Sequence, residues 1–400
     1  MKILRKMYSR VVEYKYGKMT DRSEFLGGSG EDHGNEYCCS NTLVFERGQF
    51  FKAEDLVSHL AKLQSTLDLH AKDLNERFSA RLAVSFRESH EVLEADGVND
   101  SRYCNCLKVV VKSAANGGVV SESLIGPNSY ESVCAGVETC VSEFENRILA
   151  TRDSTVTDSI RENIDVLLRP KAAGQFFHEA VGHLLEGDTF ELAMDQLMGR
   201  VLDPKISFGD SIVDHQELVG LNLIDDECTA IQPMWFIQNG VLNDVIRTKQ
   251  FNFSSAELRG FARSQSILFP PMPRMRMCVL QPVIGARLQR FSNRFFLLDN
   301  VYNGTVVPHA LRYYLRGSGY LVVDDVKRAY VPNATVSGDL FMTLESIPYI
   351  GDDVSVFASD CFKNGQVVRV GYSSPSVVLL NQMVDGGKVD LVRPEVYSYG

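Results

Sequence analysis

The chain has 400 residues, 41 of them basic and 51 acidic, so its formal net charge is −10. A hydrophobic content of 44% excludes general disorder, which requires few apolar residues together with a high net charge. The acidic balance argues against a nucleic-acid-binding protein, because such proteins need a basic face for the phosphates. The length predicts two or three domains.

The N-terminal segment and the cysteines indicate the cellular compartment of the protein. The first 18 residues are basic but contain no apolar core of the kind that a secretory signal needs. No run of about 20 apolar residues is present, so the sequence predicts no membrane-spanning helix. The nine cysteines are an odd number and are scattered, which favours a reducing compartment. We therefore expect a cytoplasmic protein with no nucleic-acid or membrane partner.

An N-terminal α+β domain is predicted over residues 1–155. Residues 20–40 are polar and glycine-rich, which is typical of a loop. The pattern of residues 52–80 predicts a helix, and the strings RLAVSFRES, CLKVVVKS and GVVSESL then predict an antiparallel meander. A second helix is expected to begin near Asn128, which forms a capping-box pattern with Glu131. Its apolar stripe consists of Val133, Val137, Val141, Phe144 and Ile148.

A second domain is predicted over residues 160–400, after the polar stretch 151–159. It opens with the apolar strand IDVLLRP, which leads directly into KAAGQFFHEAVGHLLEGD. After about residue 200 the sequence suggests short strands and turns with few helical patterns. The fold class is therefore α+β, with a β-rich C-terminal domain that carries the helix of the HEAVGH string.

The string HEAVGH, with His178, Glu179 and His183, is the most informative motif in a chain with only eight histidines. In the commoner HExxH motif, i,i+4 spacing places two imidazoles about 40° apart on an α-helix, whereas i,i+5 spacing places them about 140° apart. Two histidines at this spacing can hold one metal ion only if the helix is distorted. We therefore predict a π-bulge or kink between Glu179 and His183, eased by Gly182, and a helix end at Gly187.

The glutamate and the third ligand complete the interpretation of the motif. A glutamate directly after the first histidine is the general base of metalloproteases. A catalytic zinc site usually has three protein ligands, so one more is required. Spacing alone does not choose among the candidates, which are His215, His309, Cys361 and the acidic triplet Asp225-Asp226-Glu227.

At this point the sequence resembles the TldD/PmbA family of zinc metallopeptidases, in the same order over about residues 160–385. The matching segments are HEAVGHLLEGD, LNLIDDECT, FIQNGVLNDV, PPMPRM, VSGDLFMTLESIPYIGDD and DCFKNGQVVRVGYSSPSV. Single pieces are short, but six in one order are specific. The resemblance is to the active TldD-like subunit, which carries HExxxH.

The resemblance implies a ligand set and a mechanism. His178, His183 and Cys361 fall on the zinc ligands of the family, and Glu179 would activate a zinc-bound water for attack on a peptide carbonyl. Arg274, in the PMPRM segment, and His309 are candidate substrate-binding residues. The implied cofactor is Zn²⁺.

The chain also departs from the family pattern. Its first 80 residues match poorly and look shortened, and the region 301–320 lacks the family's glycine-rich stretch. Phe362 and Cys228 stand where the family has glycine. These differences predict a retained zinc centre with an altered substrate region. The acidic triplet would either order a loop near the site or form a solvated turn.

Three functions remain open. The first is zinc-dependent hydrolysis of amide bonds in small, unfolded or modified peptides. The second is a specialised biosynthetic enzyme that uses the same zinc centre on a dedicated peptide or a non-peptide amide. The third is a non-catalytic partner subunit. The resemblance also implies a dimer, either a homodimer or a heterodimer with another family member.

Overall fold

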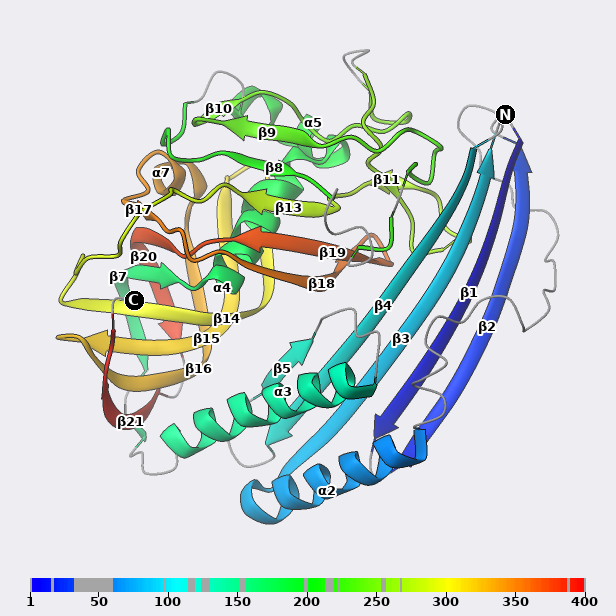
Figure 1. Ribbon diagram of the computed structural model, residues 1–400. Coiled ribbons are helices and arrows are strands. Elements are labelled where there is room, and N and C mark those ends of the chain that lie inside the picture. The colour runs from blue at the N-terminus through cyan, green and yellow to red at the C-terminus, as the bar shows by residue number, and fades with distance from the viewer. Residues whose placement is uncertain are drawn as a thin grey trace.

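The computed structural model of the protein describes residues 2–15, 18–31, 60–95, 98–113, 119–123, 130–151, 156–157, 159–197, 201–212, 219–221, 223–252, 257–266, 268–386 and 389–398. The fold is α+β, as the sequence predicts. Figure 1 shows a long N-terminal sheet flanked by helices, beside a larger C-terminal half built of further sheets. Among the described residues, no helix is both long and apolar enough to cross a membrane.

The N-terminal half is an antiparallel sheet with the strand order β2-β1-β3-β4-β5. Its elements are β1 (Lys2–Lys15), β2 (Lys18–Glu31), α2 (Leu60–Phe78), β3 (Ala80–Ala95), β4 (Val98–Ser113), β5 (Val119–Ser123) and α3 (Tyr130–Thr151). The predicted meander is confirmed as β3, β4 and β5. Both expected helices are present. Their predicted first residues, about residue 52 for α2 and Asn128 for α3, lie outside the described residues.

Helices α2 and α3 pack on this sheet through apolar stripes. Val133, Val137 and Phe144 of α3 are buried in one cluster with Leu67 and Leu74 of α2. Inward-facing residues of β3 and β4 complete the cluster, and these are Leu82, Val84, Leu107, Val109 and Val111. The stripe that the sequence predicts on α3 therefore faces this core.

The expectation of a loop over residues 20–40 is wrong for its first part. Residues up to Glu31 belong to β2, which pairs with β1 along its whole length, from Lys18 opposite Lys15 to Glu31 opposite Lys2. An edge strand of a sheet tolerates polar residues and can be read as a loop, because its backbone pairing requires no continuous apolar pattern. Residues 32–40 lie outside the described residues.

The C-terminal half contains two larger sheets. An eight-stranded sheet has the order β17-β20-β7-β14-β15-β16-β21-β6, and a six-stranded sheet has the order β10-β9-β8-β13-β19-β18. The strands of the first are β6 (Val156–Thr157), β7 (Ile160–Leu168), β14 (Arg294–Val307), β15 (Arg312–Val323), β16 (Val326–Asp339), β17 (Tyr349–Ile350), β20 (Val377–Gly386) and β21 (Val389–Val396). Those of the second are β8 (Phe208–Asp210), β9 (Met234–Gln238), β10 (Val241–Leu242), β13 (Met277–Leu280), β18 (Ser355–Lys363) and β19 (Gln366–Ser374).

Two features of the eight-stranded sheet matter for the site. Strand β20 pairs with both β7 and β16, so β7, β14, β15, β16 and β20 close on themselves. Strands β14, β15 and β16 are 14, 12 and 14 residues long, which corrects the expectation of only short strands here. Register shifts, for example between Leu298 and Asn300, interrupt the alternation of apolar and polar residues along these strands. The sequence pattern therefore predicts shorter strands than the structure has.

Helical segments lie among these sheets. They are α4 (Pro170–Phe176), the π-helix η2 (Phe177–Val181), the 3₁₀-helix η3 (Gly182–Leu185), α5 (Gly187–Leu197) and the short α7 (Leu340–Leu344). A two-stranded sheet joins β11 (Ala262–Arg263) to β12 (Met272–Pro273). The helical segment of the motif ends at its C-cap Glu186, which is extended (φ −72°, ψ 130°), so Gly187 occupies the predicted C′ position and is also the first residue of α5.

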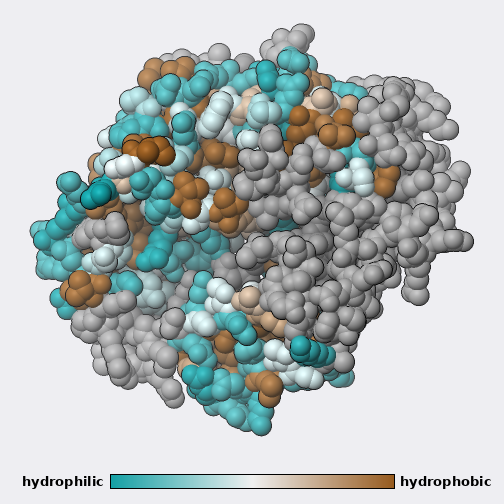
Figure 2. Space-filling view, viewed as in Figure 1, coloured by the Kyte–Doolittle hydropathy of each residue, from teal (hydrophilic) through white to brown (hydrophobic). Residues whose placement is uncertain are grey.

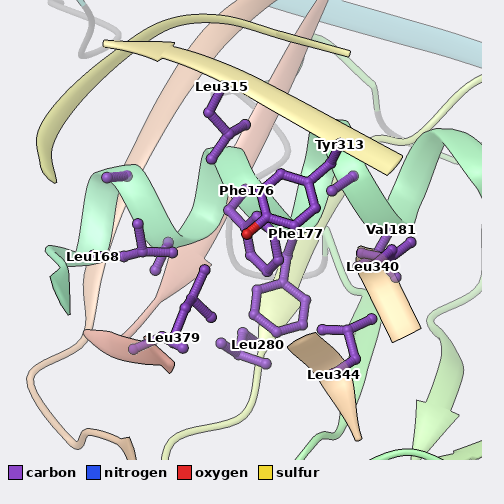
Figure 3. Close-up of a cluster of buried hydrophobic side chains, with 14 of the residues drawn as sticks. Leu168, Phe176, Phe177, Val181, Leu280, Tyr313, Leu315, Leu340, Leu344 and Leu379 are labelled. Carbon is purple, nitrogen blue, oxygen red and sulfur yellow. The ribbon is translucent and has the colours of Figure 1, made fainter. Parts of the chain in front are cut away.

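The main core holds the helix of the HEAVGH string between the sheets. The ring of Phe176 packs edge-on against Tyr313 of β15, with ring centroids 5.0 Å apart, and Figure 3 shows Phe177 beside Leu280 and Leu344. Phe176 and Phe177 are both fully buried. This packing fixes the helix immediately before His178.

Candidate metal centre

The helix that carries the two motif histidines changes its winding at the motif. The α-helical turns of α4 pass into the π-helix Phe177–Val181 and then into the 3₁₀-helix Gly182–Leu185. The Gly182 N–H donates to the carbonyls of His178 and Phe177, and the bond to Phe177 spans five residues. The predicted bulge between Glu179 and His183 is confirmed, and it places the two imidazole rings with centroids 4.7 Å apart.

Gly182 serves this turn in a different way from the one expected. Its torsions (φ −59°, ψ −47°) are ordinary for a helix, so the distortion itself requires no glycine here. A Cβ at Gly182 would instead lie 2.0 Å from the sulfur of Met275. A larger residue at this position would displace the Met275 side chain, which packs directly on the helix backbone.

Cys361, from strand β18, joins the two histidines. The ligand atoms of His178, His183 and Cys361 all lie within 4.8 Å of one another, and the Cys361 Sγ is 3.4 Å from His183 Nε2. His178 and Cys361 are buried. Of the alternative third ligands, His215 lies outside the described residues, and among the described residues only these three form such a group.

The chemistry of this group fits a zinc ion. His178 Nε2 is buried and has no hydrogen-bond partner among the described residues, although a buried polar atom normally has one. Imidazole nitrogens and cysteine thiolates are both zinc ligands, and three protein ligands leave a fourth position for substrate or water. A cation at this point would satisfy the unpaired nitrogen.

Each motif histidine has a partner on its other ring nitrogen. His183 Nδ1 lies 2.7 Å from Glu186 Oε2, and His178 Nδ1 lies 3.6 Å from the thiol of Cys278. Partners of this kind fix the tautomer and orientation of metal-binding histidines. The sequence prediction did not include Glu186 or Cys278. The LEGD string offered a signal for Glu186, whereas nothing in the sequence pointed to Cys278.

The electrostatics of the group favour a deprotonated thiol. Burial alone would raise the pKa of the Cys361 thiol, but His178 and His183 outweigh burial and hold this pKa well below its usual range. For Glu186, burial is likewise outweighed, by His183 and Lys363, and its pKa is lowered. A thiolate is the form that binds metal.

Glu179 lies beside the three candidate ligands. Its Oε2 is 3.8 Å from His183 Nε2, and its side chain is 23% exposed. Burial raises the pKa of Glu179, although His178 and His183 oppose that shift. Gly304 of β14 packs against it so closely that a Cβ there would lie 2.6 Å from Glu179 Cβ and Cγ. The carboxylate is therefore confined between β14 and the histidines.

The two candidate substrate-binding residues occupy very different positions. Arg274 is fully buried, and its Nη2 donates to the carbonyl of Cys361 at 2.7 Å. Its prediction as a residue that faces substrate is therefore wrong, because its guanidinium supports the strand that carries Cys361. His309 is exposed at the turn between β14 and β15, on the hairpin that carries Gly304, and its role stays a prediction.

The acidic triplet does not form a solvated turn. Asp225 and Asp226 are buried, and Asp226 forms an ion pair with Arg102 of β4 at 2.5 Å. The same Asp226 accepts bonds from the backbone and hydroxyl of Ser264. The turn thus fastens the N-terminal sheet to the C-terminal half. Cys228, at a position where glycine is expected, has a left-handed φ of 61°.

Comparisons with known proteins agree on one group. Residues 161–386 match the family model described as the PmbA/TldA metallopeptidase C-terminal domain. A zinc metalloprotease TldD homolog from Saccharolobus solfataricus is 25% identical in an alignment of 254 residues that covers 60% of this chain and 57% of that protein. A metalloprotease from Methanothermobacter thermautotrophicus is 28% identical in an alignment of 245 residues that covers 56% of this chain and 50% of that protein. The chain thus spans only about half the length of these relatives.

The fold itself has a solved counterpart. The crystal structure of TldE from Thermococcus kodakarensis superposes with a TM-score of 0.64 at 14% identity, and the match covers 96% of this chain and 97% of that chain. At this identity the likeness concerns the fold alone. It extends over both the N-terminal sheet and the C-terminal half, beyond the region that the family model matches.

Proposed function

The chain belongs to the PmbA/TldD family of metallopeptidases, and we propose that it hydrolyses amide bonds in small, unfolded or modified peptides with the help of zinc. The observation that carries the proposal is the convergence of His178, His183 and Cys361 around the unpaired His178 Nε2, with Glu179 alongside. A partner subunit that had lost catalysis would have no chemical need for all four residues.

The three ligands would hold the ion from two segments, the η2–η3 turn and strand β18. Bound zinc would supply Lewis acidity to the peptide carbonyl and to the attacking water. The outer contacts of His183 with Glu186, and of His178 with Cys278, would hold the rings in place. The pairing of the Cys361 carbonyl with Arg274 would hold the strand.

Glu179 would perform the proton transfers. Its carboxylate takes a proton from the attacking water as the oxygen bonds to the carbonyl carbon. It then delivers that proton to the nitrogen of the breaking C–N bond, so the products are a carboxylic acid and an amine. Its confinement against Gly304 and near His183 suits this role, because a general base must be held within reach of the water.

The substrate is proposed to be an extended peptide segment. Strand β18, which carries Cys361, is the last strand in the order of the six-stranded sheet, and such an edge can accept an extended chain. Recognition through the backbone would suit peptides of varied sequence. We further propose a cytoplasmic location and a dimer, formed either with a second copy or with another family member.

Metal analysis and two substitutions test the function. The purified protein should contain about one zinc per chain, and Cys361→Ser should lose it. Glu179→Gln should keep the zinc and lose turnover of a peptide library. A wild-type protein that binds no zinc, or a Glu179→Gln variant with full activity, would refute the proposal. Turnover confined to one dedicated peptide or a non-peptide amide would favour the specialised biosynthetic role.

A further inference from the structure

Lys363 lies between the two segments from which the candidate metal ligands come. Its Nζ is 2.6 Å from Glu186 Oε2 and 2.6 Å from Asp188 Oδ1, and its side chain is only 14% exposed. Glu186 and Asp188 flank the junction of η3 and α5, whereas Lys363 ends strand β18. The ammonium group therefore bridges the helical segment and the strand.

Lys363 and Cys361 are placed to act together. Side chains two residues apart on a strand point to the same face, so both are directed toward the helix of the motif. Cys361 Sγ approaches His183 Nε2, and Lys363 Nζ approaches the carboxylate that holds His183 Nδ1. Two residues of strand β18 therefore act on the two ring nitrogens of His183. Cys361 approaches Nε2 directly, and Lys363 acts on Nδ1 through Glu186.

Glu186 needs this cation. Its side chain has no exposed surface, and a buried carboxylate is costly unless it is paired and fully hydrogen-bonded. Its Oε1 accepts the backbone N–H of Met275 at 3.2 Å, and its Oε2 receives His183 and Lys363. A neutral imidazole that binds a metal brings no positive charge to this carboxylate. Lys363 is then the cation in direct contact with this carboxylate, and the buried guanidinium of Arg274 adds positive charge nearby.

We propose that Lys363 is a positioning residue for the metal site, acting through Glu186 to orient His183 and to join strand β18 to the motif helix. The inference rests on the proposed zinc site. It assigns to Lys363 a role in metal affinity, with no contact to the metal or to the substrate.

The test is the zinc affinity of the full chain, measured by competition with a chromogenic chelator. Lys363→Met should bind zinc about tenfold more weakly, the lower end of the loss seen when a direct partner of a metal ligand is removed, because Lys363 acts through Glu186. Lys363→Arg should recover most of the affinity because it keeps the charge, and Lys363→Gln should fall between the two. The matched control is Lys205→Met, which removes a lysine from another carboxylate pair, with Asp203 at 2.8 Å, and should leave the affinity unchanged.

Two further readouts separate positioning from a general loss of stability. In the Co²⁺-loaded protein, Lys363→Met should shift the absorption bands of the metal, because the orientation of His183 changes. The losses from Lys363→Met and Glu186→Gln should be less than additive in the double variant, since one residue acts through the other. If Lys363→Met fails to fold, the Gln and Arg variants carry the same comparison.

The outcomes are distinct from those for the function itself. Wild-type protein that binds no zinc refutes the proposed function. Wild-type protein that binds zinc, together with a Lys363→Met variant within about threefold of its affinity, overturns the role of Lys363 alone, because the expected loss is about tenfold. An arginine variant no better than the methionine variant, or additive losses in the double variant, would do the same.

Discussion

The N-terminal sheet and the C-terminal half bring their residues together by different means. In the N-terminal sheet, β1–β2, β3–β4 and β4–β5 are antiparallel pairs of consecutive strands, and two helices cover them. In the C-terminal half, β7 pairs in parallel with β14, and β13 with β19. His183 and Cys361, whose side chains nearly touch, are 178 residues apart in the chain. The candidate chemistry thus lies where long-range pairing builds the structure.

Because the two halves are built by different kinds of strand pairing, we expect them to respond differently to substitution. The described part of the N-terminal half has its own buried cluster, separate from the main core behind the metal site. The two halves meet at the ion pair of Arg102 with Asp226, at the contact of Leu93 with Ile224, and where α3 contacts β21. Substitutions in the sheet should therefore change stability, and substitutions near the motif should also change the metal site.

The largest effect is expected from Glu179→Gln, in the C-terminal half. Loss of the general base should lower kcat by about 10²- to 10⁴-fold, with zinc content and unfolding midpoint unchanged. Steady-state hydrolysis and metal analysis of the same sample measure this. The control is Glu191→Gln on the exposed surface of α5, which should retain full activity.

Breaking the junction between the halves should give the next largest effect. Arg102 is 2% exposed and pairs with Asp100, Asp226 and Glu91, so Arg102→Met removes the positive charge that balances these carboxylates. Urea denaturation should show a loss of about 3–5 kcal/mol. Arg77→Met, which removes the exposed pairs with Asp73 and Glu145, should leave the stability nearly unchanged. Equal losses in the two variants would contradict the assignment of Arg102 as the fastening residue.

A pair of leucine substitutions tests whether the halves are independent. Leu74→Ala in α2 and Leu184→Ala in η3 remove the same atoms from fully buried positions, and each should cost about 2–5 kcal/mol of stability. Only Leu184→Ala should also weaken zinc binding, because Leu184 is adjacent to His183. A change in zinc affinity on Leu74→Ala would show that the N-terminal core and the metal site are coupled.

The smallest effect is expected at Phe362. This side chain is 70% exposed beside Cys361, at a position where the resemblance predicts glycine. Phe362→Gly should change kcat/KM by about tenfold or less between substrates with small and bulky side chains, the range typical of one apolar contact. This change is measured by the cleavage profile of Phe362→Gly on a peptide library. The control is the profile of Met342→Ala, which alters another exposed side chain. Identical profiles for wild type and variant would exclude Phe362 from substrate selection.

Most exposed apolar side chains on the surface carry no such assignment. They include Ile284, Met342 and Leu268, and Figure 2 shows hydrophobic residues in small groups among hydrophilic ones on the face in view. Scattered apolar residues of this kind are ordinary for a folded protein. Phe362 differs because it is adjacent in sequence to a candidate ligand.

The sequence predicted what local patterns can encode. The stripe on α3, the meander of β3–β5 and the distorted turn after His178 follow from periodicity and spacing. Strand β2 was missed because an edge strand needs no apolar alternation. The long strands β14–β16 were missed because bulges break their alternation.

The site was predictable to a smaller extent. Spacing identified His178 and His183, whereas Cys361 was selected by the resemblance. The roles of Glu186, Lys363 and Cys278 depend on contacts between distant segments, which no local pattern records. Arg274 was predicted to bind substrate for the same reason. Its hydrogen bond to the Cys361 carbonyl joins distant segments, so the sequence could not indicate its burial.

The π-helical turn has a consequence for the length of the motif. Deleting one residue between Glu179 and His183 would give the i,i+4 spacing of HExxH and a regular helix, so the two imidazoles would still share a face. The residues after the deletion would keep nearly the same direction about the helix axis, because the π-turn already absorbs the extra residue. The contact of Glu186 with Lys363 would be kept, and only the widened turn just before the backbone packed under Met275 would be lost. The extra residue therefore widens the turn between the two histidines without changing the phase of the contacts that support them.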